Sequence, residues 1–291
     1  MNKKRSTQLS MLCVLAAGVL WGCMGILVRT MSEGGFNSLE VTAFRAFVTA
    51  VVMLIGMSLF HRKALKIRGR DIWCFLGTGI LSVVFFNVCY FTCMKYTTLS
   101  VAAILLYTAP SFVMVMSFFL FKERFSAKKL MALLLAFMGC VLVSGGFGGG
   151  NIGMWGVLTG LGAGFGYALY SIFSRYALLK GYSTYTITTY TFLFAAVGSL
   201  PFIDIGHVAE CLHTGAASLP FYLLMAIATT VVAYLLYTKG LTGLENGRAS
   251  IIASIEPVMA SVVGVVLYHE TMEPMGVAGM LMVLISCILV V

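Results

Sequence analysis

Long apolar segments recur along the whole chain, and polar residues gather in short stretches between them. We predict ten segments, each long enough to cross a lipid bilayer as a helix of about 20 residues. They cover residues 9–29, 38–60, 72–94, 98–121, 127–145, 153–175, 184–202, 218–238, 248–268 and 273–291. A membrane barrel is disfavoured, because barrel strands alternate polar and apolar positions over about ten residues and these segments are continuously apolar.

The composition indicates the same class of protein. Of the 291 residues, 60% are hydrophobic and 10% are charged, whereas an average soluble domain has about 25% charged residues. This excludes a soluble enzyme and a disordered chain. The eight cysteines form no CxxC pair, so we expect no disulfide framework, no metal site and no cofactor. The predicted fold class is an all-α membrane protein.

The basic residues predict the orientation of the chain. If the N-terminus is cytoplasmic, all but three of the 19 Lys and Arg residues fall in cytoplasmic connections or at their edges; the exceptions are Arg29, Arg45 and Lys95. Cytoplasmic loops of membrane proteins carry such an excess of basic residues. We therefore interpret the net charge of +9 as a sign of topology and expect no nucleic-acid partner. Ten spans return the C-terminus to the cytoplasm.

The two halves of the chain resemble each other at a nearly constant offset. Residues 18–29 align with residues 164–175, which pairs Arg29 with Arg175, and one more residue of offset pairs Pro110 with Pro257. We predict a first five-helix repeat over residues 1–146, a Gly-rich linker over 147–152 and a second repeat over 153–291. Because five is an odd number, the second repeat would cross the membrane in the opposite orientation, as in the inverted repeats of many secondary transporters.

Several short motifs in the chain are typical of one family. They are Trp21 and Gly22 followed by Arg29, Arg45 in the second segment, Pro110 followed by Phe-Lys-Glu at residues 121–123, and Ile-Glu-Pro at 255–257 followed by Tyr-His-Glu at 268–270. With them the chain resembles the ten-helix EamA-like branch of the drug/metabolite transporter superfamily. The resemblance implies two inverted five-helix repeats around a central cavity lined by helices 1, 3, 4, 6, 8 and 9. It also implies export of amino acids, other metabolites or drugs.

Two charged residues are predicted to lie within the membrane. Glu256 falls about eight residues into the ninth segment, and such an acid is by default a functional hypothesis. It could accept a proton for coupling, bind a substrate amine, or satisfy the carbonyl group that Pro257 leaves free. Arg45 could pair with Glu40 or Glu256, bind a substrate carboxylate, or extend toward the membrane surface.

Polar and aromatic side chains gather on the helices that the family uses for its cavity, and we predict that they line it. A polar-aromatic face should point into the bundle, although hydrogen bonding and packing between helices would also explain it. The predicted cavity residues are Trp21, Asn87, Tyr90, Tyr107, Thr108, Tyr167, Tyr170, Ser171, Ser174, Tyr234, Tyr237 and Ser254.

Two further features bear on helix contacts. Gly18 and Gly22 are spaced so that another helix can approach closely. Glu123 and Glu270 follow the fourth and ninth segments at opposite membrane faces and occupy equivalent positions in the two repeats. They are candidate gates, although capping and anchoring at the membrane surface would equally explain them.

The sequence thus predicts a secondary transporter in a bacterial-type cytoplasmic membrane, which exports amino acids or related small metabolites by alternating access. The alternative within transport is a multidrug or organic-cation exporter, whose expected mark is an acid without a compensating Arg. A membrane-embedded enzyme or a scaffold is the alternative from a different class. The expected partners are a small-molecule substrate, the lipid bilayer and protons or another coupling ion, with the protein as a monomer or homodimer.

Overall fold

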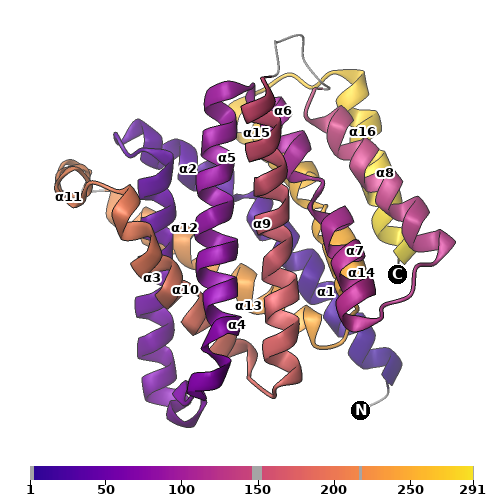
Figure 1. Ribbon diagram of the computed structural model, residues 1–291. Coiled ribbons are helices and arrows are strands. Elements are labelled where there is room, and N and C mark those ends of the chain that lie inside the picture. The colour runs from indigo at the N-terminus through magenta and orange to yellow at the C-terminus, as the bar shows by residue number, and fades with distance from the viewer. Residues whose placement is uncertain (1–2, 146–152, 216–217, 291) are drawn as a thin grey trace.

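The computed structural model describes residues 3–145, 153–215 and 218–290, and all regular structure in these ranges is helical (Figure 1). The linker predicted at residues 147–152 lies outside the described residues. The prediction of an all-α membrane protein is confirmed at this level.

Seven helical segments among the described residues are long and apolar enough to cross a membrane. An eighth is added if α10 and α11, which are bent by 103°, count as one span. The seven are α1 (Lys3–Gly22) with α2 (Met24–Glu33); α3 (Ser38–Phe60); η2 (Gly69–Asp71), α4 (Ile72–Leu76), η3 (Gly77–Val84) and α5 (Phe85–Tyr96); α6 (Leu99–Leu106) with α7 (Ala109–Phe121); α9 (Met154–Leu179); α12 (Leu219–Ala226), η6 (Ile227–Val232) and α13 (Ala233–Leu241); and α14 (Asn246–Ala253) with α15 (Glu256–Tyr268).

The remaining helices are shorter or lie outside these spans. They are η1 (Arg62–Leu65), α8 (Ala127–Val143), α10 (Thr184–Ser199), η4 (Leu200–Phe202), α11 (Ile205–Thr214) and α16 (Pro274–Val290). The helices α8 and α16 have 17 residues each, at the lower limit of a membrane span. They lie side by side at the right of Figure 1 and cross where Gly139 meets Gly279.

The two halves share the same irregularities. The fourth and ninth predicted segments each break in the middle, at Tyr107–Thr108 and at Ser254–Ile255. In both cases a proline is the second residue of the helix that follows, and a proline nitrogen cannot donate the hydrogen bond that would continue the helix. The helices after the breaks end alike, at Lys122 and His269, with φ of 56° and 53°.

Helix α1 packs against α13, α14 and α15 and reaches the second of these breaks. A Cβ atom on Gly18 would lie 2.5 Å from Ile255 Cγ2, and one on Gly22 would lie 2.5 Å from Met259 Cβ. The close approach predicted for Gly18 and Gly22 is confirmed. It holds the end of α1 against the start of α15, where Glu256 stands.

Candidate functional site

A small cavity lies inside the bundle, between α6, α7, α9, α13, α14 and α15. Six predicted site residues line it: Tyr107, Tyr167, Ser171, Tyr237, Ser254 and Glu256. Glu256 is the one charged side chain among the lining residues. The cavity volume of about 20 Å³ accommodates about one water molecule, so an organic solute can enter only if the helices separate.

The helix break places Glu256 at the cavity. Glu256 is the first residue of α15, where the partial positive charge of a helix N-terminus favours an anion. Its Oε2 accepts a hydrogen bond of 3.3 Å from the hydroxyl of Tyr167 on α9. This bond links the second half's broken helix to the helix that begins the same half.

An aromatic cluster borders the cavity. The ring of Trp21 packs against those of Tyr167, Tyr234 and Tyr237, at centroid distances of 6.0, 5.2 and 5.1 Å. The hydroxyls are paired within the cluster: Tyr237 bonds Ser171 at 2.7 Å, and Tyr170 bonds Thr238 on α13 at 2.7 Å. The indole Nε1 of Trp21 is buried and has no hydrogen-bond partner among the described residues.

Arg45 carries the opposite charge into the interior from α3. Its side chain is 8% exposed, and its Nε donates a hydrogen bond of 2.9 Å to Thr230 Oγ1 in η6. Within the described ranges, no carboxylate lies within the 4 Å of an ion pair with Arg45. Neither of the pairings considered from the sequence, with Glu40 or with Glu256, is formed as an ion pair among the described residues.

Other predicted cavity residues make contacts elsewhere and are absent from the lining. Asn87 accepts a hydrogen bond from Thr42 and donates one to the carbonyl of Val83, and therefore joins α5 to α3. Tyr90 packs against Phe86 and Phe91. The other members of this group border the lining or point into helix contacts; they are Trp21, Thr108, Tyr170, Ser174 and Tyr234.

Sequence reasoning missed two residues of the site. Ser250 lines the cavity one turn before Ser254, and the four-residue spacing puts both on one helix face, which was a usable signal. Thr230 binds Arg45 from 185 positions away, and no sequence pattern connects the two residues.

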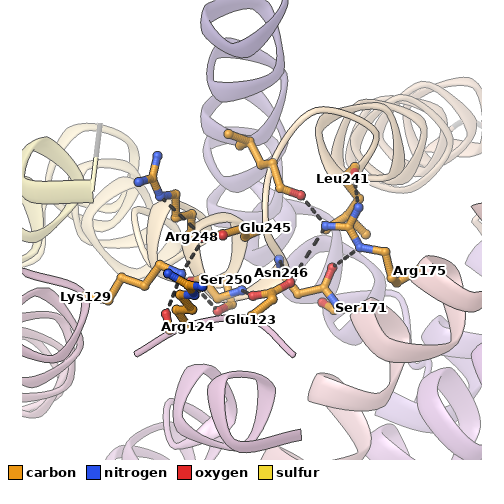
Figure 2. Close-up of polar contacts among 12 residues, drawn as sticks. Glu123, Arg124, Lys129, Ser171, Arg175, Leu241, Glu245, Asn246, Arg248 and Ser250 are labelled. Carbon is orange, nitrogen blue, oxygen red and sulfur yellow. Dashed lines mark hydrogen bonds and ion pairs between the residues drawn. The ribbon is translucent and has the colours of Figure 1, made fainter. Parts of the chain in front are cut away.

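The candidate gate Glu123 sits in a network at one end of the bundle (Figure 2). Its carboxylate accepts hydrogen bonds from the backbone N–H groups of Asn246 (2.8 Å) and Gly247 (3.2 Å), at the start of α14. Arg175 on α9 lies 3.9 Å from Glu123 and also donates to Asn246 and to the carbonyls of Leu241 and Leu244. We call the contact between Arg175 and Glu123 the first Arg–Glu pair.

The other candidate gate, Glu270, forms an equivalent pair. Arg29 on α2 donates to Glu270 Oε1 at 2.7 Å, and its guanidinium lies 3.8 Å from the ring centre of Tyr268. This second Arg–Glu pair is exposed, since its side chains are 46% and 52% accessible, whereas those of the first pair are 18% and 11% accessible. Each pair joins an arginine of one half to a glutamate of the other.

A further contact stands apart from the cavity. Glu40, at the start of α3, is 1% exposed and lies 2.9 Å from Nδ1 of His207 on α11. The hydrogen bond to Glu40 and its negative charge raise the pKa of His207 above its ordinary value of 6.5. The pair fastens α11 to the end of α3.

The fold and this interior define a class of protein, namely a helical membrane protein with several spans and a charged, aromatic interior. The family model of the EamA-like transporter family matches twice, at residues 8–145 and 154–291. The chain belongs to the EamA-like transporter family.

Its relatives are also described as transporters. The uncharacterized transporter YwfM of Bacillus subtilis is 25% identical over 96% of this chain and 92% of its own length. An uncharacterized transporter of Archaeoglobus fulgidus is 28% identical over 93% of this chain and 92% of its own. The uncharacterized inner membrane transporter YicL of Salmonella typhimurium is 24% identical over 98% and 96%.

A crystal structure described only as that of a protein shares the fold. The TM-score is 0.78, with 16% sequence identity, 96% of this chain and 95% of that chain covered. At this identity the likeness concerns the fold alone. Transport is supported by the family match and by the names of the relatives.

Proposed function

We propose that this protein is a secondary transporter that exports an amino acid or a related small metabolite across a bacterial-type cytoplasmic membrane. Family membership and the names of the relatives support transport, and YicL is named an inner membrane transporter. We favour a zwitterion as the substrate because a base, Arg45, is buried in the bundle in addition to the acid Glu256 at the cavity, and the two form no ion pair among the described residues. The missing ion pair alone would equally fit the organic-cation exporter, so the choice rests on the presence of Arg45.

The two charges are suited to opposite ends of such a molecule. Glu256 would bind the ammonium group, because it faces the cavity and is held by one hydroxyl. Arg45 would bind the carboxylate. Its Nε donates to Thr230, and its two terminal nitrogens donate no hydrogen bond among the described residues. A charge removed from water is costly unless it is paired, so a zwitterion would satisfy both residues at once.

We propose ten spans in two inverted repeats, with movement of one half against the other as the transport step. The paired helix breaks and the paired left-handed residues Lys122 and His269 support the repeat. The helices α8 and α16, which meet at glycines, would be the fifth span of each half. Odd-numbered repeats of this kind give alternate access to a site at their interface.

The two Arg–Glu pairs would act as gates at the two ends. The first pair holds α14, which carries Ser250 of the cavity and is followed by Ser254, to the end of α7 and to α9. The second pair holds α2 to the end of α15, which begins with Glu256. With an N-in orientation, as the basic residues favour, the first pair lies at the cytoplasmic face and the second at the outer face.

The coupling ion belongs to the same proposal. Glu256 would take up a proton when the substrate leaves, because a carboxylate away from water and without a cationic partner is more stable in its protonated, neutral form. Export would then use the proton gradient, and the N- and C-termini would both lie in the cytoplasm.

Uptake into proteoliposomes tests the substrate class. Radiolabelled neutral amino acids should show saturable counterflow, whereas nucleobases and tetramethylammonium should not. The Arg45→Gln variant should bind the amino acid about 10- to 100-fold more weakly, as expected for a lost hydrogen bond between charged groups, but bind the matching amine without a carboxylate as before. The control variant Arg70→Gln alters an exposed arginine and should behave as the wild type.

Two results would overturn the proposal. Transport of tetramethylammonium without transport of amino acids would favour the organic-cation exporter. Equal losses for the amino acid and the amine in Arg45→Gln would show that Arg45 has a structural role and does not bind the carboxylate.

A further inference from the structure

The indole nitrogen of Trp21 is an unexplained donor beside the cavity. The side chain is 6% exposed, and Nε1 has no acceptor among the described residues. Buried Trp N–H groups usually find a partner, and a buried donor without one is unfavourable. An apolar bicyclic ring of the same shape would pack without that cost, so the N–H itself is left unexplained by packing.

The rings around the indole connect it to the cavity. One neighbour of the indole ring is Tyr167, which lines the cavity and donates its hydroxyl hydrogen to Glu256. Another is Tyr234, whose ring also packs against Tyr170 and Phe192. The third, Tyr237, lines the cavity.

Close packing of the helix keeps the indole at this place. A Cβ on Gly22 would lie 2.6 Å from the carbonyl oxygen of Glu256, so α1 touches the first turn of α15 directly. The contact fixes Trp21, the residue next to Gly22, beside residues that line the cavity. The donor therefore stays near the site, and no acceptor for it is present among the described residues.

We infer that the N–H of Trp21 donates a hydrogen bond to the carboxylate of the bound substrate and is a specificity-determining residue. The inference rests on the proposed function. Glu256 would bind the ammonium group and repel a carboxylate, which leaves the opposite end of the molecule to Arg45 and Trp21. A substrate without a carboxylate would leave the N–H unpaired, and the site would discriminate against it.

Paired substrates isolate this bond from the packing of the ring. The binding of one amino acid that the wild type transports is compared with that of the amine lacking its carboxylate, by competition in proteoliposomes. The Trp21→Phe variant should lower the affinity for the amino acid about tenfold to a hundredfold, the range for a hydrogen bond to a charged group. It should change the affinity for the amine less than about twofold. Trp155→Phe, at a residue 70% exposed, is the control and should change neither.

A second replacement guards against a general defect of the variant. Benzothienylalanine at position 21 keeps the shape of the indole and lacks the N–H, and should reproduce the selective loss while the melting temperature stays that of the wild type. The role of Trp21 would be overturned if the affinities for the amino acid and the amine fell equally. It would also be overturned if neither replacement lowered the affinity for the amino acid. Wild-type protein that transports no amino acid would instead overturn the proposed function.

Discussion

Gly22 offers the sharpest test of the packing around the site. Replacing it with alanine adds a Cβ that would lie 2.5 Å from Met259 Cβ, 2.6 Å from the carbonyl oxygen of Glu256 and 3.0 Å from the nitrogen of Ala260. Two of these atoms belong to the backbone of α15, so the added atom can be accommodated only if α1 and α15 move apart. Gly25, three residues later on α2, provides the matched control, because a Cβ added there would meet no described atom within 4 Å.

The expected effects have opposite signs. Overpacking of this kind costs about 1–3 kcal/mol, and the gain of alanine over glycine in a helix is at most about 1 kcal/mol. With a mid-range overpacking cost of about 2 kcal/mol, Gly22→Ala should therefore lose about 1–2 kcal/mol, whereas Gly25→Ala has only the favourable term. At about 2–4 °C per kcal/mol, the melting temperature of Gly22→Ala should fall by about 2–8 °C and that of Gly25→Ala should stay equal or rise.

Thermal unfolding of the three purified proteins in the same detergent measures the difference. Circular dichroism at 222 nm follows the loss of helix. If Gly22→Ala melts with the wild type, or if both alanine variants lose stability equally, the contact between α1 and α15 is not as tight as described.

Three further predictions concern charged groups. Glu123→Gln removes a carboxylate bound to two backbone N–H groups and should lower the free energy of unfolding by about 1–3 kcal/mol. Glu270→Gln breaks an exposed ion pair and should lower it by at most about 1 kcal/mol. Equal melting temperatures of the two variants would contradict this ranking. The pKa of His207 is raised in the folded protein. Its contact with Glu40 should therefore stabilise the protein fully below pH 6.5, and this stabilisation should disappear as pH rises through the raised pKa. A His207→Gln variant should show a flatter profile of melting temperature against pH from 5 to 9. Glu256→Gln should abolish substrate-driven proton movement in proteoliposomes, and unchanged proton movement would refute coupling through Glu256.

The sequence predicted the helical class, and some of the side chains that line the small cavity, for a physical reason. Apolar length reports membrane spans directly, and polar side chains on such helices face the bundle, as Tyr107, Tyr167 and Tyr237 do. The prolines at 110 and 257 marked the places where helices break.

Other features depend on contacts between distant residues and leave no local signal. The segments η3 and η6 are π-helices, whose turns are wider than those of an α-helix. They contain no proline, and the periodicity of apolar residues does not distinguish them from α-helix. The choice of Thr230 over a carboxylate as the partner of Arg45 follows from how α3 meets η6. Likewise, Glu123 was expected to cap or to gate, and the backbone N–H groups that it binds belong to a helix 123 residues further along.

The crossed origin of the two Arg–Glu pairs has a consequence for assembly. Arg29 and Glu123 come from the first half, and Arg175 and Glu270 come from the second. Neither half alone contains a complete pair, but two copies of either half, related by a twofold axis, would hold the residues for both. If the two halves are inverted repeats, as proposed, this is the arrangement of a symmetric dimer whose subunits are joined into one chain. Glu256 and Arg45 have no charged counterpart in the other half, and such asymmetry is open to a single joined chain but closed to a dimer of identical copies.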